Sequence, residues 1–262
     1  NIKTRICLAV IELSLYGNLH DFLRDNSTGF TNLQPEKSSE DEPTDATATY
    51  ENELKIKFNL LDLISFCEQI ASGMNFMGRK NVIHGDLATR NVLVFENNVV
   101  KITDFGLSRK LYGCANYVKT QQAPLPWRWL AVETLRYLSF STKSDVWAFG
   151  VTAWEIFTLA QVPFAALNWT LQFVDELEAG LRLQKPNHSP ESIYEMMLHC
   201  WENNPDDRPT FATLESFFKN FLYQQKQLEV SDYTNIPLPT NDGGSKNCPY
   251  KLWRRSGISA PQ

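Results

Sequence analysis

The sequence lacks several features that would assign the chain to a particular class of protein. Basic residues are not in excess, because 25 Lys and Arg stand against 30 Asp and Glu, and no basic stripe is visible. A nucleic-acid partner needs clustered positive charge and is therefore not expected. No run of about 18 apolar residues occurs, since Glu155 interrupts the most hydrophobic stretch, from Val146 to Phe157. No segment of this sequence is expected to span a membrane.

Cysteine is also scarce, with five residues that are widely separated and never arranged as Cys-x-x-Cys. This pattern is typical of reduced thiols in a cytosolic compartment and does not favour a metal cage. The apolar fraction of 43% is nevertheless sufficient for a core, which excludes wholesale disorder. The length of 262 residues allows one large domain or two smaller ones.

Composition divides the chain into segments. Residues 1–24 are predicted to form a strand at Ile6–Ile11 and a short helix at Leu19–Leu23. Residues 25–54 are rich in Ser, Thr, Asn, Pro and carboxylates, so we expect an acidic, disordered insertion. Residues 226–262 show no periodicity and are predicted to be a disordered tail.

Between these polar segments, residues 55–225 are expected to be mainly helical. Asn59 and Asp62 form a capping-box pattern at the start of a long amphipathic helix. Two β-branched runs, Val92–Phe95 and Val99–Thr103, flank a polar turn and predict a hairpin. The other predicted helices are Thr142–Leu159, which is apolar on all sides, Thr170–Ala179, Pro190–Trp201 with Ser189 as cap, and Phe211–Leu222 with Thr210 as cap.

Two motifs frame the predicted hairpin. The first reads HGDLATRN over His84–Asn91, and the second reads DFG over Asp104–Gly106. Phosphoryl transfer to a hydroxyl requires an Asp, an Asn five residues later and a second Asp beyond a hairpin. Asp86 would orient the acceptor hydroxyl and receive its proton. Asn91 and Asp104 would offer oxygen ligands to magnesium on the nucleotide phosphates.

These motifs resemble those of protein kinases, and the resemblance extends from Ile6 to about Tyr223 except for the insertion. The chain looks like a tyrosine kinase, because Thr89-Arg90 stands where serine/threonine kinases carry Lys followed by Pro. The segment LPWRWLA, Leu125–Ala131, resembles the tyrosine-kinase platform for a phenol. Two further matches to the family's closing motif are Cys200-Trp201 and Pro205–Pro209.

The resemblance implies an α+β, protein-kinase-like fold. It would consist of a mainly α-helical large lobe with a hinge strand and a catalytic-loop β-hairpin. No GxGxxG loop occurs and no strand lysine precedes Ile6, so the small N-lobe is largely missing from this sequence. We therefore expect a C-lobe fragment that binds nucleotide poorly and is inactive by itself.

The insertion resembles the split kinase domain of receptors for platelet-derived and vascular endothelial growth factors. Gly85 in HGD and Val132 in LAVETL look like features of the arthropod branch of that family. The resemblance implies a single-pass plasma-membrane receptor, dimerised by growth factor, with this segment on the cytoplasmic side.

The resemblance also implies roles for individual residues, with ATP and Mg²⁺ as cofactors. Asp86 would be the catalytic base, with Arg90 near the phosphates and the substrate, and Asn91 and Asp104 would be the metal ligands. Glu12 and Ser14 would bond adenine through their backbones, with Ile11 behind the pocket and Leu93 beneath the ring. The residues implied in ATP binding are Glu12, Ser14, Arg90, Asn91 and Leu93.

Other residues receive structural roles from the same resemblance. His84 and Phe105 would pack below the site, and His84 is expected to be a packed, hydrogen-bonded residue and not a base. Asp145 would hold the backbone of the catalytic loop. Glu133 would form a buried ion pair with Arg208.

Four tyrosines are candidates for phosphorylation. Tyr112 and Tyr117 resemble paired activation-loop tyrosines, which a dimer partner would phosphorylate in trans. Tyr50 and Tyr233 each begin a Tyr-x-Asn pattern, which resembles a docking sequence for SH2 adaptors. The implied partners are thus protein tyrosine substrates, the second receptor of a dimer, and SH2 adaptors.

Two alternatives remain beside the tyrosine kinase. A catalytically silent scaffold would bind adaptors through phosphotyrosines, and the missing N-lobe favours it. The complete set of Asp86, Asn91 and Asp104 disfavours it, because a scaffold has no physical need for all three. A serine/threonine kinase is disfavoured by Thr89-Arg90 and by the platform.

Overall fold

The computed structural model describes residues 12–31, 56–110, 116–118 and 125–234. The chain divides into two compact units, residues 1–225 and 226–262, and nearly all described residues belong to the first. None of the helices in the described ranges combines the length and apolarity needed to cross a membrane. The predicted strand at Ile6–Ile11 lies outside the described residues.

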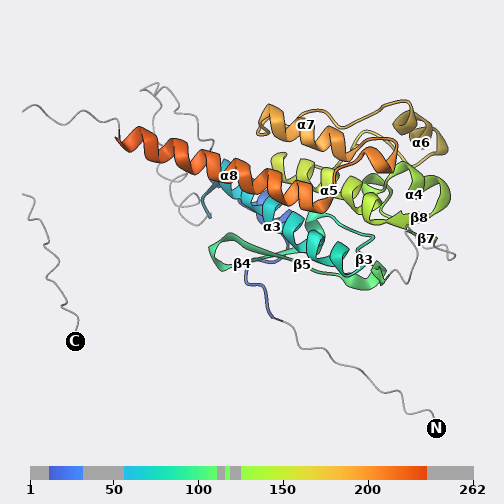
Figure 1. The fold of residues 1–262 in the computed structure, drawn as a ribbon, viewed down its shortest axis with the longest axis horizontal. Helices are drawn as coiled ribbons and strands as arrows, with labels where there is room; N and C mark the ends of the chain where they lie inside the picture. The colour runs from blue at the N-terminus through green and yellow to red at the C-terminus, as the bar shows by residue number, and fades with distance from the viewer. Residues whose placement is uncertain (1–11, 32–55, 111–115, 119–124, 235–262) are drawn as a thin grey trace, which may run out of the picture. The chain divides into compact units, whose positions relative to one another are not determined.

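The described part of the chain is built mainly of helices (Figure 1). The helices are α1 (Leu19–Asp25), α3 (Leu60–Arg79), α4 (Val132–Tyr137), α5 (Thr142–Phe157), α6 (Leu171–Glu178), α7 (Glu191–Cys200) and α8 (Phe211–Thr234). The strands are β1 (Phe30–Thr31), β2 (Phe58–Asn59), β3 (Val82–Ile83), β4 (Val92–Phe95), β5 (Val99–Ile102), β6 (Arg109–Lys110), β7 (Asn116–Val118) and β8 (Ser139–Ser141). They pair as β1–β2, which is parallel, and as the antiparallel pairs β3–β6, β4–β5 and β7–β8.

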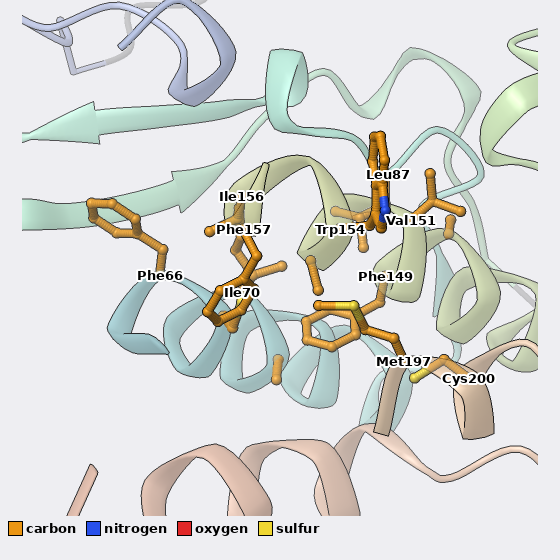
Figure 2. Packing of buried hydrophobic residues seen from close by; sticks show 14 of the residues in the cluster. Phe66, Ile70, Leu87, Phe149, Val151, Trp154, Ile156, Phe157, Met197 and Cys200 are labelled. Atoms are coloured by element: carbon orange, nitrogen blue, oxygen red, sulfur yellow. The ribbon is translucent and has the colours of Figure 1, made fainter. Parts of the chain in front are cut away.

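Helix α5 lies at the centre of the core. Its residues from Ser144 to Phe157 are all buried, as the near-continuous apolar sequence predicted. It packs against α3 and α7. Figure 2 shows Phe157 and Phe149 of α5 in one buried cluster with Ile70 of α3 and Met197 of α7. Because α5 is enclosed on all sides, side chains that point from it can reach several segments of the unit.

Helix α3 supports the β4–β5 hairpin. Its capping box is present as predicted, since the Asn59 side chain accepts from the backbone N–H of Asp62 and the Asp62 carboxylate accepts from that of Asn59. The Gln69 side chain accepts from Val100 N at 2.9 Å and donates to Asn98 O at 3.0 Å. These bonds fix the turn of the hairpin to the helix.

The start of the predicted insertion is ordered, contrary to expectation. Helix α1 runs to Asp25, and β1 pairs with β2 with Phe30 opposite Phe58. The rings of these two phenylalanines lie 5.5 Å apart, and Asn26 accepts from the backbone N–H of Ile56 at 3.0 Å. Residues 25–31 therefore differ from the predicted disorder, because Phe30 finds an apolar partner beyond the polar segment.

Other helix boundaries also differ from the predictions. Helix α8 runs to Thr234, past the predicted end of the last helix and into the segment predicted as a disordered tail. Pro190 occupies the N-cap of α7 in place of Ser189. Helix α4 was not predicted, because six residues with mixed polarity give no clear periodicity.

Candidate active site

The segment His84–Asn91 is fixed to α5 through its backbone. The buried carboxylate of Asp145 accepts from His84 N at 2.8 Å and from Gly85 N at 2.9 Å. Asp145 is only 2% exposed, and burial raises its pKa to about 7, against the opposing effect of these two bonds. The predicted contact between Asp145 and the backbone of this loop is confirmed.

Asp86 lies at the centre of a cluster of predicted site residues. The Asn91 amide donates to the Asp86 backbone carbonyl at 2.7 Å and to its carboxylate at 3.0 Å. Arg90 Nη2 donates to the other carboxylate oxygen at 2.5 Å. A 3₁₀ turn over Thr89–Asn91 brings these side chains to one place. Both oxygens of Asp86 are therefore oriented by neighbouring donors.

His84 packs beneath this cluster as a neutral ring. Its Nε2 faces Thr103 O at 3.0 Å, and its Nδ1 accepts from Asp86 N at 3.2 Å, a pattern that assigns the proton to Nε2. Burial lowers the pKa of His84, which keeps the ring neutral. The rings of His84 and Phe105 lie 5.5 Å apart. His84 is thus a packed, hydrogen-bonded residue, as predicted.

Asp104 lies two residues after the end of β5, next to the same cluster. Thr103 N donates to Asn91 O at 2.9 Å, which joins the backbone before Asp104 to the backbone of Asn91. Asp104 has a positive φ of 57°, and its carboxylate accepts from Gly106 N at 3.2 Å. The segment Asp104–Gly106 is thus held beside the loop that contains Asp86 and Asn91.

The donor atoms at this place suit a hard cation. Asn91 and Asp104 offer amide and carboxylate oxygens, and magnesium takes few protein ligands while retaining water and phosphate oxygens. No group of three or more His, Cys, Asp or Glu side chains that could hold a metal occurs among the described residues. Asn91 and Asp104 are thus the residues present that fit a magnesium ion bound together with phosphate oxygens.

The described residues implied in adenine binding lie together at the hairpin, with Leu93 on β4 and residues 12–14 beside it. Ser14 Oγ donates to Val94 O at 2.6 Å, and the Glu12 carboxylate pairs with Lys101 on β5. Leu93, on β4 and opposite Lys101, is half-buried and also bridges to Asn18. The structure thus places residues 12–14 beside Leu93. Ile11 lies outside the described residues.

Comparison with known proteins identifies the family. Residues 2–218 match the family profile described as protein tyrosine and serine/threonine kinase. The chain belongs to this kinase family. The predicted kinase-like fold, mainly helical in the described part, is therefore confirmed.

Several receptors are similar to this kinase chain. Vascular endothelial growth factor receptor 1 of Gallus gallus is 41% identical over 214 residues, which are 82% of this chain and 16% of that receptor. The same receptor of Homo sapiens is 38% identical over 242 residues, 90% of this chain and 18% of the receptor. Receptor 2 of Danio rerio is 43% identical over 181 residues, 69% of this chain and 13% of the receptor. The predicted resemblance to this receptor family is confirmed, whereas the placement in its arthropod branch stays a prediction.

The candidate phosphorylation sites are only partly described. The backbone of Tyr117 lies in β7, where it pairs with Phe140 of β8, and Tyr233 lies near the end of α8. Tyr50 and Tyr112 lie outside the described residues. The regulatory roles of these four tyrosines therefore remain predictions.

The predicted ion pair between Glu133 and Arg208 is present in the kinase fold. Arg208 donates to both carboxylate oxygens of Glu133, at 2.7 and 2.9 Å, and its side chain is 0% exposed.

Val132, beside Glu133, is the first residue of α4. The N–H at that position has no acceptor within a helix, so Val and Pro can both occupy it.

One residue near the kinase site was missed by the sequence reasoning. Glu155 of α5 is 2% exposed and contacts Thr89 and Trp129, on either side of Arg90. The signal in the sequence is a single Glu inside the apolar stretch Val146–Phe157, which by itself indicates only that this stretch does not span a membrane. The imidazole of His20, on α1, lies near Glu155, with Nδ1 3.8 Å from the carboxylate.

We expect the Glu155 carboxylate to raise the pKa of His20. This carboxylate, 3.8 Å from His20 Nδ1, raises the pKa from 6.5, and burial opposes the shift. The pair therefore stabilises the fold below pH 6.5, and that contribution is lost as the pH rises through the raised pKa. In an NMR titration, Glu155→Gln should move the His20 pKa back toward 6.5. His188, whose pKa burial lowers, is the control and should not respond.

Proposed function

We propose that the chain is the large-lobe part of a receptor protein tyrosine kinase that transfers the γ-phosphoryl group of ATP to protein tyrosine. The observation that carries this proposal is the cluster of Asp86, Arg90 and Asn91 at one end of the hairpin. Asp104, which follows the second strand, lies at this same end of the hairpin, where Val92 pairs with Ile102. Polar loop residues without a catalytic role have no reason to converge in this way.

The geometry supports a defined division of work. Asp86 would accept the proton of the tyrosine hydroxyl while the tyrosine oxygen bonds to the γ-phosphorus of ATP. The bond between the γ-phosphorus and the oxygen that bridges it to the β-phosphate breaks at the same time, and ADP is released. Arg90 and Asn91 orient the two carboxylate oxygens, so that little reorganisation is needed. Asn91 and Asp104 would hold Mg²⁺, which neutralises charge on the transferred group when it is bound.

The features that favour tyrosine over serine lie around Arg90. Its guanidinium is 4.3 Å from the ring of Trp129, which belongs to the platform after Leu125. A flat surface built from a guanidinium and an indole would suit the flat ring of a phenolic side chain. On the nucleotide side, residues 12–14 and Leu93 are the proposed adenine contacts.

The whole protein is proposed from the likeness to the receptors. It would be a single-pass receptor of the plasma membrane in which a dimer partner phosphorylates Tyr112 and Tyr117. Tyr50 and Tyr233 would then be docking sites for SH2 adaptors. The four proposed segments are residues 1–24 with the hinge, the insertion, the large lobe to residue 225, and the tail.

Transfer to tyrosine can be tested directly. The full-length protein would be isolated from membranes, incubated with labelled ATP and Mg²⁺, and its products separated by phosphoamino-acid analysis. Phosphotyrosine as the only product would support the proposal. Phosphoserine or phosphothreonine would support the serine/threonine alternative, and no transfer from a dimeric preparation would support the silent scaffold.

Gly85 provides a prediction about regulation. Gly85 stands where most kinases that this chain resembles have an Arg, and that Arg pairs with an activation-loop phosphotyrosine. Gly85 has a φ of +80°, and a Cβ would meet Leu107 O at 3.4 Å, so Arg fits at a backbone cost of about 1–2 kcal/mol. We expect Gly85→Arg to increase the dependence of activity on Tyr117 phosphorylation, measured as the activity ratio before and after phosphatase treatment.

The control for this change is Gly85→Ala, which introduces the same backbone strain without a guanidinium. Its activity ratio should equal that of the parent. An equal ratio for the Arg variant as well would contradict a role for this position in reading the phosphotyrosine.

A further inference from the structure

Glu155 is an unusual residue for its place in the fold. It lies near the end of α5, the enclosed central helix, and is 2% exposed. The ion pairs of the described residues give it only His20 as a partner, at 3.8 Å, and no Lys or Arg. Burying a carboxylate without a close cation is unfavourable, so its hydrogen bonds must compensate for the lost water.

Those hydrogen bonds join two separate parts of the site. One carboxylate oxygen accepts from the hydroxyl of Thr89 at 2.8 Å. The other accepts from Thr89 N at 3.1 Å and from the Trp129 indole Nε1 at 2.8 Å. Glu155 therefore ties the loop that contains Asp86 to the platform that contains Trp129.

Both tethered residues flank Arg90. Thr89 precedes it in the chain, and the Trp129 ring lies 4.3 Å from its guanidinium. Arg90 in turn donates to the Asp86 carboxylate at 2.5 Å. The backbone before Arg90 and the surface beneath its guanidinium are thus both held by a single buried carboxylate.

We propose that Glu155 is a positioning residue for phosphoryl transfer, which holds Thr89 and Trp129 so that Arg90 presents the base Asp86 to the acceptor hydroxyl. This inference rests on the proposed kinase function and adds a residue that the family motifs do not include. Glu155 does not itself reach the reacting atoms, so its effect is on alignment, where small displacements are costly.

The hydrogen-bond pattern distinguishes two substitutions. In Glu155→Gln, the amide oxygen can accept from Thr89 N and Trp129 Nε1, while the amide NH₂ donates to the Thr89 hydroxyl, which also accepts. All the tethers persist and only the charge is removed. Glu155→Leu has a similar volume and removes every tether.

The kinetic test uses the full-length kinase and a tyrosine peptide. We expect Glu155→Leu to lower kcat per folded molecule by about 10–100-fold, with KM for ATP within about twofold. Glu155→Gln should restore kcat to within about threefold of the parent. Trp129→Phe keeps a ring under Arg90 but loses the hydrogen bond to Glu155. Its decrease in kcat should not add to the decrease caused by Glu155→Leu when the two changes are combined.

Thr152→Val is the matched control for damage to the core. Thr152 is fully buried on the same helix and bonds only to Ala148 O, at 2.8 Å. Its kcat per folded molecule should equal that of the parent. Parental kcat in Glu155→Leu would overturn the proposal, and so would an equal loss in Glu155→Gln, because charge and not alignment would then matter.

A second readout does not depend on activity. In this chain, hydrogen exchange of the Trp129 indole N–H, assigned by its loss in Trp129→Phe, should be slow in the parent and in Glu155→Gln. It should be at least about tenfold faster in Glu155→Leu. Unchanged exchange would overturn the tether. If the parent protein did not transfer phosphate to tyrosine, the proposed function would be refuted. The exchange of the Trp129 indole N–H would still show whether Glu155 holds Trp129.

Discussion

Asp86→Asn should reduce transfer of phosphate to a tyrosine peptide by about 10²–10⁴-fold, because it removes the proton acceptor. The change is nearly isosteric, and its amide oxygen can still accept from Arg90 Nη2, which lies 2.5 Å from Asp86 Oδ1. Asn91 keeps its 2.7 Å bond to the backbone carbonyl of residue 86, so the loop should keep its conformation. The measurement is kcat of the full-length protein at saturating ATP and Mg²⁺.

Asp175→Asn is the matched control for this prediction. Asp175 also pairs with an arginine, Arg136, but its side chain is 63% exposed and belongs to α6. Its kcat should equal that of the parent. ATP affinity should change by less than about threefold in Asp86→Asn, since the proposed contact of Asp86 is with the acceptor hydroxyl and not with the nucleotide. Activity of Asp86→Asn within tenfold of the parent would show that another group takes the proton.

The parts of the structure that the sequence predicted are those with local signals. Asn59 and Asp62 reveal the start of α3 because a capping box is completed within one turn of helix. The buried character of α5 follows from its continuous apolar residues. The cluster around Asp86 also depends on a short segment, in which Arg90 and Asn91 lie four and five residues away.

The parts that the sequence did not predict depend on distant partners. Glu155 bonds to Thr89 and Trp129, which are 66 and 26 residues away, and no local pattern announces such a contact. The β1–β2 pair is equally non-local, because each strand has only two residues and the register joins Phe30 to Phe58 across the insertion. Periodicity cannot detect elements of that length.

Glu133→Ala should lower the free energy of unfolding by about 3–5 kcal/mol, the usual cost of removing one partner from a buried ion pair. Arg208 would keep its bonds to the carbonyls of Glu202 and Lys143, at 2.8 and 2.9 Å, but would lose its only countercharge among the described residues. Its side chain is 0% exposed, so water cannot replace the carboxylate without local opening. Urea unfolding of the 262-residue chain measures the effect.

Helix α4 supplies the control for this change, because Arg136 lies one turn after Glu133 on the same helix. Arg136 pairs with Asp175 and Glu178, whose side chains are 63% and 44% exposed, so Arg136→Ala should lower the free energy of unfolding much less than Glu133→Ala does. The double variant Glu133→Leu with Arg208→Met removes both buried charges and should recover part of the loss, since the stranded cation causes most of it. If Glu133→Ala and Arg136→Ala lowered the free energy of unfolding equally, burial of Arg208 would not control how much the Glu133–Arg208 pair contributes.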